Sequence, residues 1–363
     1  MTPTLQPHNS AKHPPQFIHN DSLVLQDMLG VGAYGSVYKA YDQVSRQMRA
    51  IKCIRTTGLD TMQRAFQGYE AKLHALVSGH PNIATLHEVV EEDDFFYMIM
   101  DCGLEGDLFS KITERGGYVG KDMAIKSIFA QIAGAVMHCH SKGVFHRDLK
   151  PENIIMFGDM VKLVDFGLAT TEPISNDFGC GSTFYLSPEC QGGYVERVTS
   201  FDSAANDVWS LGVILINLVF GRNPWKQACP RDETFSAFVL NNDFLQTILP
   251  MSAELNEIIK AVFCLNPMKR LSLPEFARRV QGCSSFTAPA DGLSAVASSS
   301  PSASPRTAAA AGAAGGPTGA EATTPTPIRF HFGHDALLCN SRDNKAQSQG
   351  QDSGVCVELH SLA

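Results

Sequence analysis

One short stretch of the sequence, VFHRDLKPENIIMF, contains three side chains whose chemistry suits the transfer of a phosphoryl group. The Asp148 carboxylate can accept, or at least orient, the proton of an attacking hydroxyl. The Lys150 ammonium can neutralise the charge of the group being transferred. Asn153 offers an amide oxygen of the kind that holds a hard metal ion. Because the run HRDLKPEN has a negligible chance of arising at random, it predicts a phosphoryl-transfer site.

The glycine-rich stretch LGVGAYGSVYKA has the spacing G-x-G-x-x-G. Glycines at this spacing let backbone N–H groups approach phosphates closely. The same spacing opens dinucleotide-binding folds, but there a helix follows the glycines. Here the alternating pattern SVYKAYD predicts a strand instead, so the dinucleotide interpretation fails. The candidate nucleotide-binding residues of this loop are Gly30, Val31, Gly32, Ala33, Gly35 and Val37. The last of these would cover the adenine.

Lys52 lies within the strand-like pattern MRAIKCI. Taken alone, it could be a surface lysine on an edge strand. The alternative is a contact with the ATP phosphates, for which the ammonium needs a carboxylate to hold it in place. Glu70 is a suitable partner, because it lies in a helix-like segment that stops at Gly79, His80 and Pro81.

Taken together, these motifs resemble those of the eukaryotic Ser/Thr protein kinases. The likeness runs from residue 22 to residue 282. It implies an α+β, bilobal fold with a small β-rich lobe and a larger helical lobe. It also implies that the protein uses ATP and Mg²⁺ to phosphorylate protein substrates. The residue patterns agree, because residues 22–100 are strand-rich with one helix near 61–78, and residues 107–280 are mainly helical.

The triplet DFG, which supplies the metal-binding aspartate in this family, occurs twice. Asp165 follows the short strand pattern MVKLV and has the family's spacing from Asp148. Asp177 follows the polar turn EPISN, where the chain should fold against the substrate. The resemblance therefore assigns Asp165 and Asn153 to the metal, with Lys52, Glu70, Asp148 and Lys150 as the other catalytic residues.

The second copy leads to a hypothesis about regulation. Many kinases carry a phosphorylatable residue at this point, and its phosphate pairs with the arginine of HRD. Residues 176–179 are Asn, Asp, Phe and Gly, none of which accepts a phosphate in that way. Asp177 could offer Arg147 a permanent negative charge, or it could simply be solvated. The sequence leaves both alternatives open.

The resemblance assigns further residues. Ser182 would be catalytic, through contacts with Asp148 and Lys150. In the stretch YMIMDCGLEGDLF, Met100 would restrict the pocket behind the adenine, and backbone groups of Asp101 and Cys102 would bind the adenine edge.

Three more residues are placed by the family's pattern, and a fourth departs from it. The Glu189 carboxylate of SPE would pair with Arg270, and Asp207 would brace the catalytic loop. His74 departs from the pattern, because the family usually has an apolar residue there.

Asp107 and Glu152 stand where some relatives bind basic side chains, so we expect protein substrates with Arg or Lys upstream of the target residue.

Two stretches, GRNPWKQA and ILPMSAELN, narrow the resemblance to the fungal Ran/Ksp-like kinases of meiosis control and nutrient signalling. The alternative function is a pseudokinase that binds partners without phosphoryl transfer. No catalytic residue is substituted, which argues against it. A small-molecule kinase would lack the SPE motif.

Composition excludes several other classes. The net charge is −8 and there is no basic run, so nucleic-acid binding is not expected. The 10 cysteines show no metal-ligand spacing, which predicts reduced thiols in the cytoplasm, with a nuclear share also open. The most apolar run, LGVILINLVFG, is too short to span a bilayer, so no membrane insertion is expected.

Composition also divides the chain into three parts. Residues 1–21 form a polar arm, residues 22–282 the kinase domain, and residues 283–363 a low-complexity tail rich in Ala, Ser, Gly, Pro and Thr. Such a tail cannot bury enough apolar surface to order itself, so disorder is expected. One apolar patch, residues 328–332, is either a docking peptide for an unknown partner or part of the tail.

Overall fold

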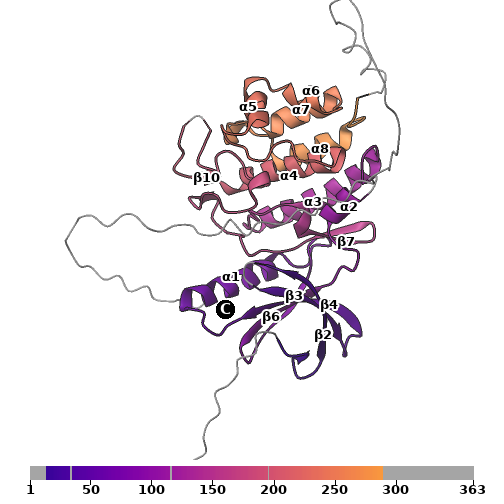
Figure 1. Cartoon of the computed structure of the whole chain (residues 1–363), viewed down its shortest axis with the longest axis vertical. Helices are drawn as coiled ribbons and strands as arrows, with labels where there is room; N and C mark the ends of the chain where they lie inside the picture. Colours follow the sequence, from indigo (N-terminus) through magenta and orange to yellow (C-terminus); the bar gives the residue numbers. More distant parts are fainter. Residues whose placement is uncertain (1–13, 33–34, 115–116, 195, 289–363) are drawn as a thin grey trace, which may run out of the picture. The chain divides into compact units, whose positions relative to one another are not determined.

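The computed structural model describes residues 14–32, 35–114, 117–194 and 196–288. Most of the expected arm, Ala33 of the glycine-rich loop, and residues 289–363 with the apolar patch lie outside these residues. The first residues of the expected tail do not, because residues 283–288 are described, and Cys283 and Phe286 are buried in the core of the large lobe. The packed chain therefore continues past the expected boundary at residue 282. The described chain forms the bilobal α+β fold expected from the sequence (Figure 1).

The small lobe is a six-stranded antiparallel sheet with the strand order β1-β2-β3-β4-β6-β5. The strands are β1 (Phe17–Ile18), β2 (Leu23–Val31), β3 (Ser36–Asp42), β4 (Gln47–Arg55), β5 (Leu86–Glu92) and β6 (Phe95–Asp101). One helix, α1 (Thr61–Val77), packs beside the sheet (Figure 1). It begins with a capping box, in which Asp60 and Gln63 each accept a backbone N–H of the other. This cap fixes where the helix that carries Glu70 begins.

The large lobe is mainly helical. Its helices are α2 (Leu108–Thr113), α3 (Asp122–Ser141), α4 (Ser203–Phe220), α5 (Glu233–Leu240), α6 (Phe244–Ile248), α7 (Ala253–Val262) and α8 (Leu273–Gly282). The described part of this lobe also contains two short two-stranded antiparallel sheets. One pairs β7 (Ile154–Phe157) with β8 (Met160–Leu163), and the other pairs β9 (Ile174–Ser175) with β10 (Phe201–Asp202). Short 3-10 turns span Pro151–Asn153, Thr183–Tyr185 and Pro267–Lys269.

Helix α4 forms the centre of this lobe. It is long and apolar enough to cross a membrane, yet 83% of its apolar window is buried inside the protein. Its Trp209 packs against Trp225 and Phe263, with ring centroids 5.7 and 4.8 Å away. Aromatic packing of this kind is typical of a core helix.

The two lobes are joined by backbone hydrogen bonds as well as by the chain itself. The Leu163 N–H of β8 donates to the Asn82 carbonyl at 2.9 Å, and the Ala84 N–H donates to the Leu163 carbonyl at 3.0 Å. This pairing brings the chain after α1 alongside the strand that leads into Asp165.

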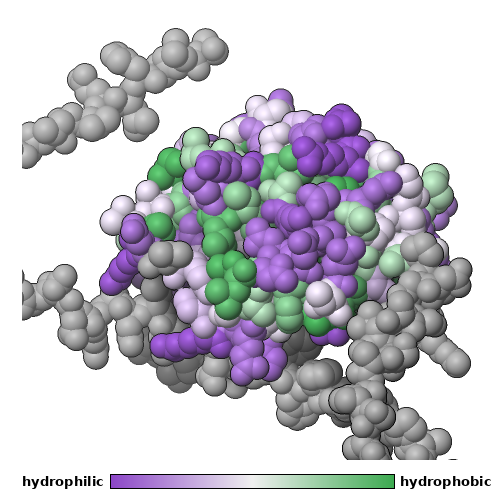
Figure 2. Space-filling view, turned by 90° about the horizontal axis from the view of Figure 1, so that it is seen from above, coloured by the Kyte–Doolittle hydropathy of each residue, from purple (hydrophilic) through white to green (hydrophobic). Residues whose placement is uncertain are grey.

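The end of the large lobe farthest from the sheet is seen in Figure 2. Hydrophilic residues dominate this view, and a band of hydrophobic residues crosses it. Among the exposed apolar side chains of α5 and α6 are Leu240 and Ile248, which are 88% and 41% exposed. None of the candidate site residues comes from α5, α6 or α7.

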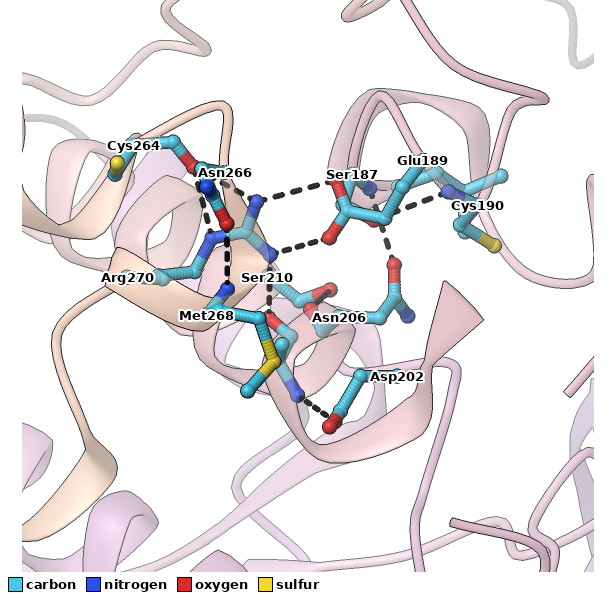
Figure 3. Close-up of polar contacts among 12 residues, drawn as sticks. Ser187, Glu189, Cys190, Asp202, Asn206, Ser210, Cys264, Asn266, Met268 and Arg270 are labelled. Carbon is cyan, nitrogen blue, oxygen red and sulfur yellow. Dashed lines mark hydrogen bonds and ion pairs between the residues drawn. The ribbon is translucent and has the colours of Figure 1, made fainter. Parts of the chain in front are cut away.

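A buried ion pair joins the SPE motif to the segment between α7 and α8 (Figure 3). The Arg270 guanidinium donates to both carboxylate oxygens of Glu189, at 2.5 and 3.1 Å. It also donates to the Ala205 and Cys264 carbonyls, and it lies 4.9 Å from the Trp209 ring. The guanidinium thus holds the SPE turn, the start of α4 and the chain before α8 together.

Replacing Arg270 with Ala should destabilise the protein strongly, because the Glu189 carboxylate would stay buried without its partner. We expect a loss of about 3–5 kcal/mol in the free energy of unfolding, measured by urea denaturation. Arg278→Ala is the matched control, since its ion pair with Glu275 is at the surface. That control should change stability little. Equal stability of the two variants would contradict the structural role of Arg270.

Candidate active site

The Asp148 carboxylate is held by three neighbours. Lys150 Nζ lies 2.7 Å from Oδ2, the backbone N–H of Ser182 donates to Oδ1 at 2.9 Å, and the Asn153 amide donates to Oδ2 at 3.2 Å. The Ser182 hydroxyl accepts a second hydrogen bond from Lys150 at 2.9 Å. These contacts join the HRDLKPEN loop to the segment that contains Ser182, and they leave Asp148 almost fully buried.

Lys52 lies between two carboxylates. Its ammonium is 2.5 Å from Glu70 Oε1 on α1 and 3.1 Å from Asp165 Oδ1. Burial alone would raise the pKa of Asp165, but attraction by the Lys52 ammonium outweighs it and holds that pKa below its usual value. Asp165 therefore stays ionised, as a metal ligand must.

The segment around Asp165 is fixed by the packing of three ring side chains against one another. Phe166 is buried between the rings of His74 and His146, with centroids 4.8 and 5.1 Å away. His74 Nε2 bonds to the Ala84 carbonyl at 2.6 Å, which assigns its proton to that nitrogen. Burial lowers the pKa of His74 to about 4, so the ring is neutral. A hydrogen-bonded neutral imidazole thus takes the place of the expected apolar side chain.

Asp207 of α4 binds the backbone of the HRDLKPEN loop. Its carboxylate accepts the backbone N–H groups of His146 and Arg147, both at 2.9 Å. His140 contributes a third contact, at 2.9 Å. Arg147 has a φ of 64°, a left-handed conformation that is costly for a non-glycine residue. The two hydrogen bonds to one buried carboxylate stabilise that strained backbone.

The glycine-rich loop lies between β2 and β3, as the alternating pattern predicts. Gly32 N–H donates to the Gly35 carbonyl at 2.8 Å across the turn. A Cβ on Gly35 would lie 2.4 Å from the Cys53 carbonyl oxygen, so a larger residue would not fit there. Val37 is paired with Lys52 on β4, which brings the glycine-rich loop and Lys52 side by side.

Met100 ends the buried part of β6, and Asp101 begins the connection between the lobes. The Asp101 N–H donates to the Thr85 carbonyl at 3.1 Å, so its carbonyl rather than its N–H remains to contact a nucleotide. Its carboxylate accepts from Lys162, at 2.7 Å, and also contacts His87. These contacts lower the pKa of Asp101 to about 2, against the opposing effect of its burial. Cys102 follows and is half-buried.

The donors near Asp148 fit a magnesium ion that is shared with a nucleotide. No group of three or more His, Cys, Asp or Glu side chains suited to a metal occurs among the described residues. Asp165 and Asn153 alone would supply oxygen ligands, since the Asn153 nitrogen is engaged by the Asp148 carbonyl at 2.9 Å. Mg²⁺ commonly binds proteins through one or two such groups and takes its other ligands from phosphates and water.

The aspartate of the second DFG, Asp177, is not placed with the candidate metal residues Asp165 and Asn153. Asp177 instead lies against Arg147, with Oδ2 2.9 Å from the guanidinium. Arg147 also donates to the Leu168 carbonyl at 2.7 Å and to the Ser175 hydroxyl at 3.3 Å. Of the two alternatives left open by the sequence, the structure favours the ion pair, although the Asp177 side chain is 60% exposed.

Comparison with known proteins agrees with this geometry. A model of the protein kinase domain matches residues 23–280. The chain belongs to the protein kinase family.

Three fungal relatives are similar to this kinase. The negative regulator of sexual conjugation and meiosis of Schizosaccharomyces pombe is 46% identical, over 74% of this chain and 61% of that protein. The serine/threonine-protein kinase VHS1 of Saccharomyces cerevisiae is 33% identical, over 74% of this chain and 60% of that protein. The S. pombe serine/threonine-protein kinase ksp1 is 34% identical, over 67% and 53%. The chain thus spans less than two thirds of the length of these relatives.

Some residues of this kinase's site were not anticipated from the sequence. Gly103 is one, because a Cβ there would lie 2.3 Å from Ile155 Cγ2. The available signal was a glycine two residues after the end of a buried strand, β6. The carboxylate contacts of Asp101 and the contact of Tyr69 with Thr171 had no such signal, since the partners are far apart in the sequence.

The contact between Arg147 and Asp177 predicts that the two residues act together. We expect Asp177→Ala and Arg147→Ala each to lower kcat/KM for a peptide substrate about threefold, because solvent weakens an ion pair whose carboxylate is 60% exposed. The double variant should be no worse than Arg147→Ala alone. The measurement is steady-state kinetics on phosphatase-treated protein. Glu172→Ala, an exposed acidic residue of the same segment, is the control. Full activity of Asp177→Ala would refute the role.

Proposed function

We propose that this chain is an active kinase that transfers the γ-phosphoryl group of MgATP to serine or threonine hydroxyls of proteins. The observation that carries the proposal is the arrangement around Asp148. Its carboxylate is fixed by Lys150, Ser182 and Asn153. A preorganised acceptor of this kind suits a hydroxyl nucleophile, because phosphoryl transfer depends mainly on positioning and charge neutralisation.

Each residue of the site has a role that follows from its contacts. Asp148 orients the substrate hydroxyl and receives its proton. Lys150 bonds both Asp148 and Ser182, so its ammonium is placed where negative charge develops. Lys52, steadied by Glu70, meets the phosphates at the other side of the site.

Two residues, Asp165 and Asn153, would hold Mg²⁺. When bound, the metal neutralises charge on the phosphate oxygens. The glycine-rich loop and the segment Met100–Cys102 would hold the nucleotide, with the Asp101 carbonyl facing the adenine edge.

The physiological role is inferred from the relatives. One of them is named a negative regulator of sexual conjugation and meiosis, and others are serine/threonine-protein kinases of yeasts. The proposed role is therefore fungal signalling that links nutrients to growth or differentiation. Apart from Cys180, the cysteines that the structure describes are free thiols, which fits a reducing compartment. The proposed location is therefore the cytoplasm, with the nucleus as an alternative.

The function is tested by MgATP-dependent labelling of a protein substrate. Wild-type protein should transfer radiolabel from ATP to serine or threonine, and Asp148→Asn should reduce turnover at least about 100-fold. Binding of a fluorescent ATP analogue should be retained in that variant, because Asp148 does not hold the adenine. Nucleotide binding without any transfer by the wild-type protein would instead support a pseudokinase scaffold.

The proposal extends to substrate choice. Glu152 is half-buried, and its Oε2 makes no hydrogen bond within the described part of the protein. Burial raises the pKa of Glu152, and the nearby carboxylates of Asp107 and Asp148 act in the same direction. A basic side chain of a substrate would relieve both effects, since it would supply a hydrogen bond and a positive charge. One Asp107 oxygen caps α2 through the Ser110 N–H, and the other remains for the same purpose.

We therefore expect a preference for Arg or Lys upstream of the phosphorylated residue. In a positional peptide library, Glu152→Gln should reduce the selectivity for Arg over Ala about tenfold, as for loss of one charged hydrogen bond. Glu105→Gln is the control, because the Glu105 carboxylate already accepts the Gly158 N–H at 2.9 Å. A wild-type library profile without any basic preference would remove this part of the proposal.

A further inference from the structure

Helix α1 touches the segment after Asp165 through one tyrosine. The Tyr69 hydroxyl lies 3.1 Å from the Thr171 hydroxyl, and it accepts the Thr171 backbone N–H at 3.3 Å. The phenol is 39% exposed, so burial does not account for its position. Two hydrogen bonds to one oxygen form a specific contact between residues 102 positions apart.

Thr171 is itself fixed relative to the catalytic loop. The preceding residue, Thr170, exchanges two backbone hydrogen bonds with Phe145, at 2.8 and 2.9 Å. Phe145 immediately precedes His146 of the HRDLKPEN motif. The Tyr69 hydroxyl therefore connects α1 to a point that the catalytic loop already holds.

On α1, the residue next to Tyr69 is Glu70, which forms the ion pair with Lys52. Tyr69 directly precedes Glu70, and the buried residues of α1 all lie from Glu70 onward. The first half of the helix therefore has no buried side chain to anchor it. A rotation of α1 that withdrew Glu70 from Lys52 would also carry the phenol away from Thr171, because adjacent helical residues move together.

We propose that Tyr69 is a positioning residue, whose hydroxyl ties α1 to Thr171 and so stabilises the arrangement in which Glu70 holds Lys52. The contact acts on the equilibrium between this arrangement and one with α1 displaced. Its effect on catalysis rests on the function proposed above, whereas its effect on the helix does not.

The test uses Tyr69→Phe in the full chain, which removes one oxygen and keeps the ring. Backbone amides of α1 should exchange with solvent about fivefold faster, the effect of losing a typical hydrogen bond. The kcat/KM for ATP should fall by a similar factor, with the KM for the peptide substrate unchanged. Thr171→Val, which removes the partner hydroxyl, should act in the same direction. The double variant should be no worse than Tyr69→Phe alone.

Tyr194→Phe is the matched control, because it removes a phenolic hydroxyl that contacts Ser236 at 3.4 Å in the large lobe. Unchanged exchange in α1 for Tyr69→Phe would overturn the inference. Faster exchange throughout the protein, with a parallel fall in the melting temperature, would also overturn it, because that result would indicate general destabilisation. If the wild-type protein transferred no phosphate, the proposed function would fail, and the exchange measurement would still decide the role of Tyr69.

Discussion

The buried carboxylate of Asp207 is the contact on which the rest of the site depends. It accepts the backbone N–H groups of His146 and Arg147, and so holds Arg147 in a left-handed conformation. In that conformation, the Arg147 guanidinium donates to the Leu168 carbonyl. Because Asp148 is the next residue in the chain, the same backbone also positions its carboxylate. A single side chain of a core helix thereby fixes the backbone of Arg147, whose guanidinium binds the segment after Asp165, and the backbone that leads into Asp148.

The positive charge of Arg147 then connects the HRDLKPEN loop to the segment that follows Asp165. The Arg147 guanidinium is nearly buried and needs partners, which it finds in Leu168, Ser175 and Asp177. Since Asp177 is more than half exposed, solvent weakens this pair, and the two neutral oxygens share the task of satisfying the guanidinium. The acidic residue therefore adds to an arrangement that is already partly fixed by the backbone.

A large part of this site could be predicted from the sequence. Asp148, Lys150 and Asn153 are close together along the chain, so their mutual contacts follow from one local loop. The pair Lys52 and Glu70 could be predicted because a strand and the helix after it are adjacent in the fold, and the family pattern names both.

Other features had no local signal. The choice between a solvated and a paired Asp177 depends on the path of an irregular loop, which periodicity does not determine. The contact between Tyr69 and Thr171 joins two residues outside any motif, and the role of the Asp101 carboxylate depends on Lys162 from another lobe. Gly103 could be noticed in the sequence, but the reason for it, close approach of β7, is visible only in three dimensions.

His74 shows how a polar residue can occupy an apolar position without weakening the site. Burying an imidazole without a partner would cost free energy, but here one nitrogen donates to the Ala84 carbonyl at 2.6 Å. With its pKa lowered to about 4 by burial, the ring carries no charge near neutral pH. A charged ring would repel the Lys52 ammonium, whose positive charge helps to lower the pKa of His74. Neutral His74 instead packs against the Phe166 ring, and it keeps the Asp165 segment in contact with α1 as an apolar side chain would.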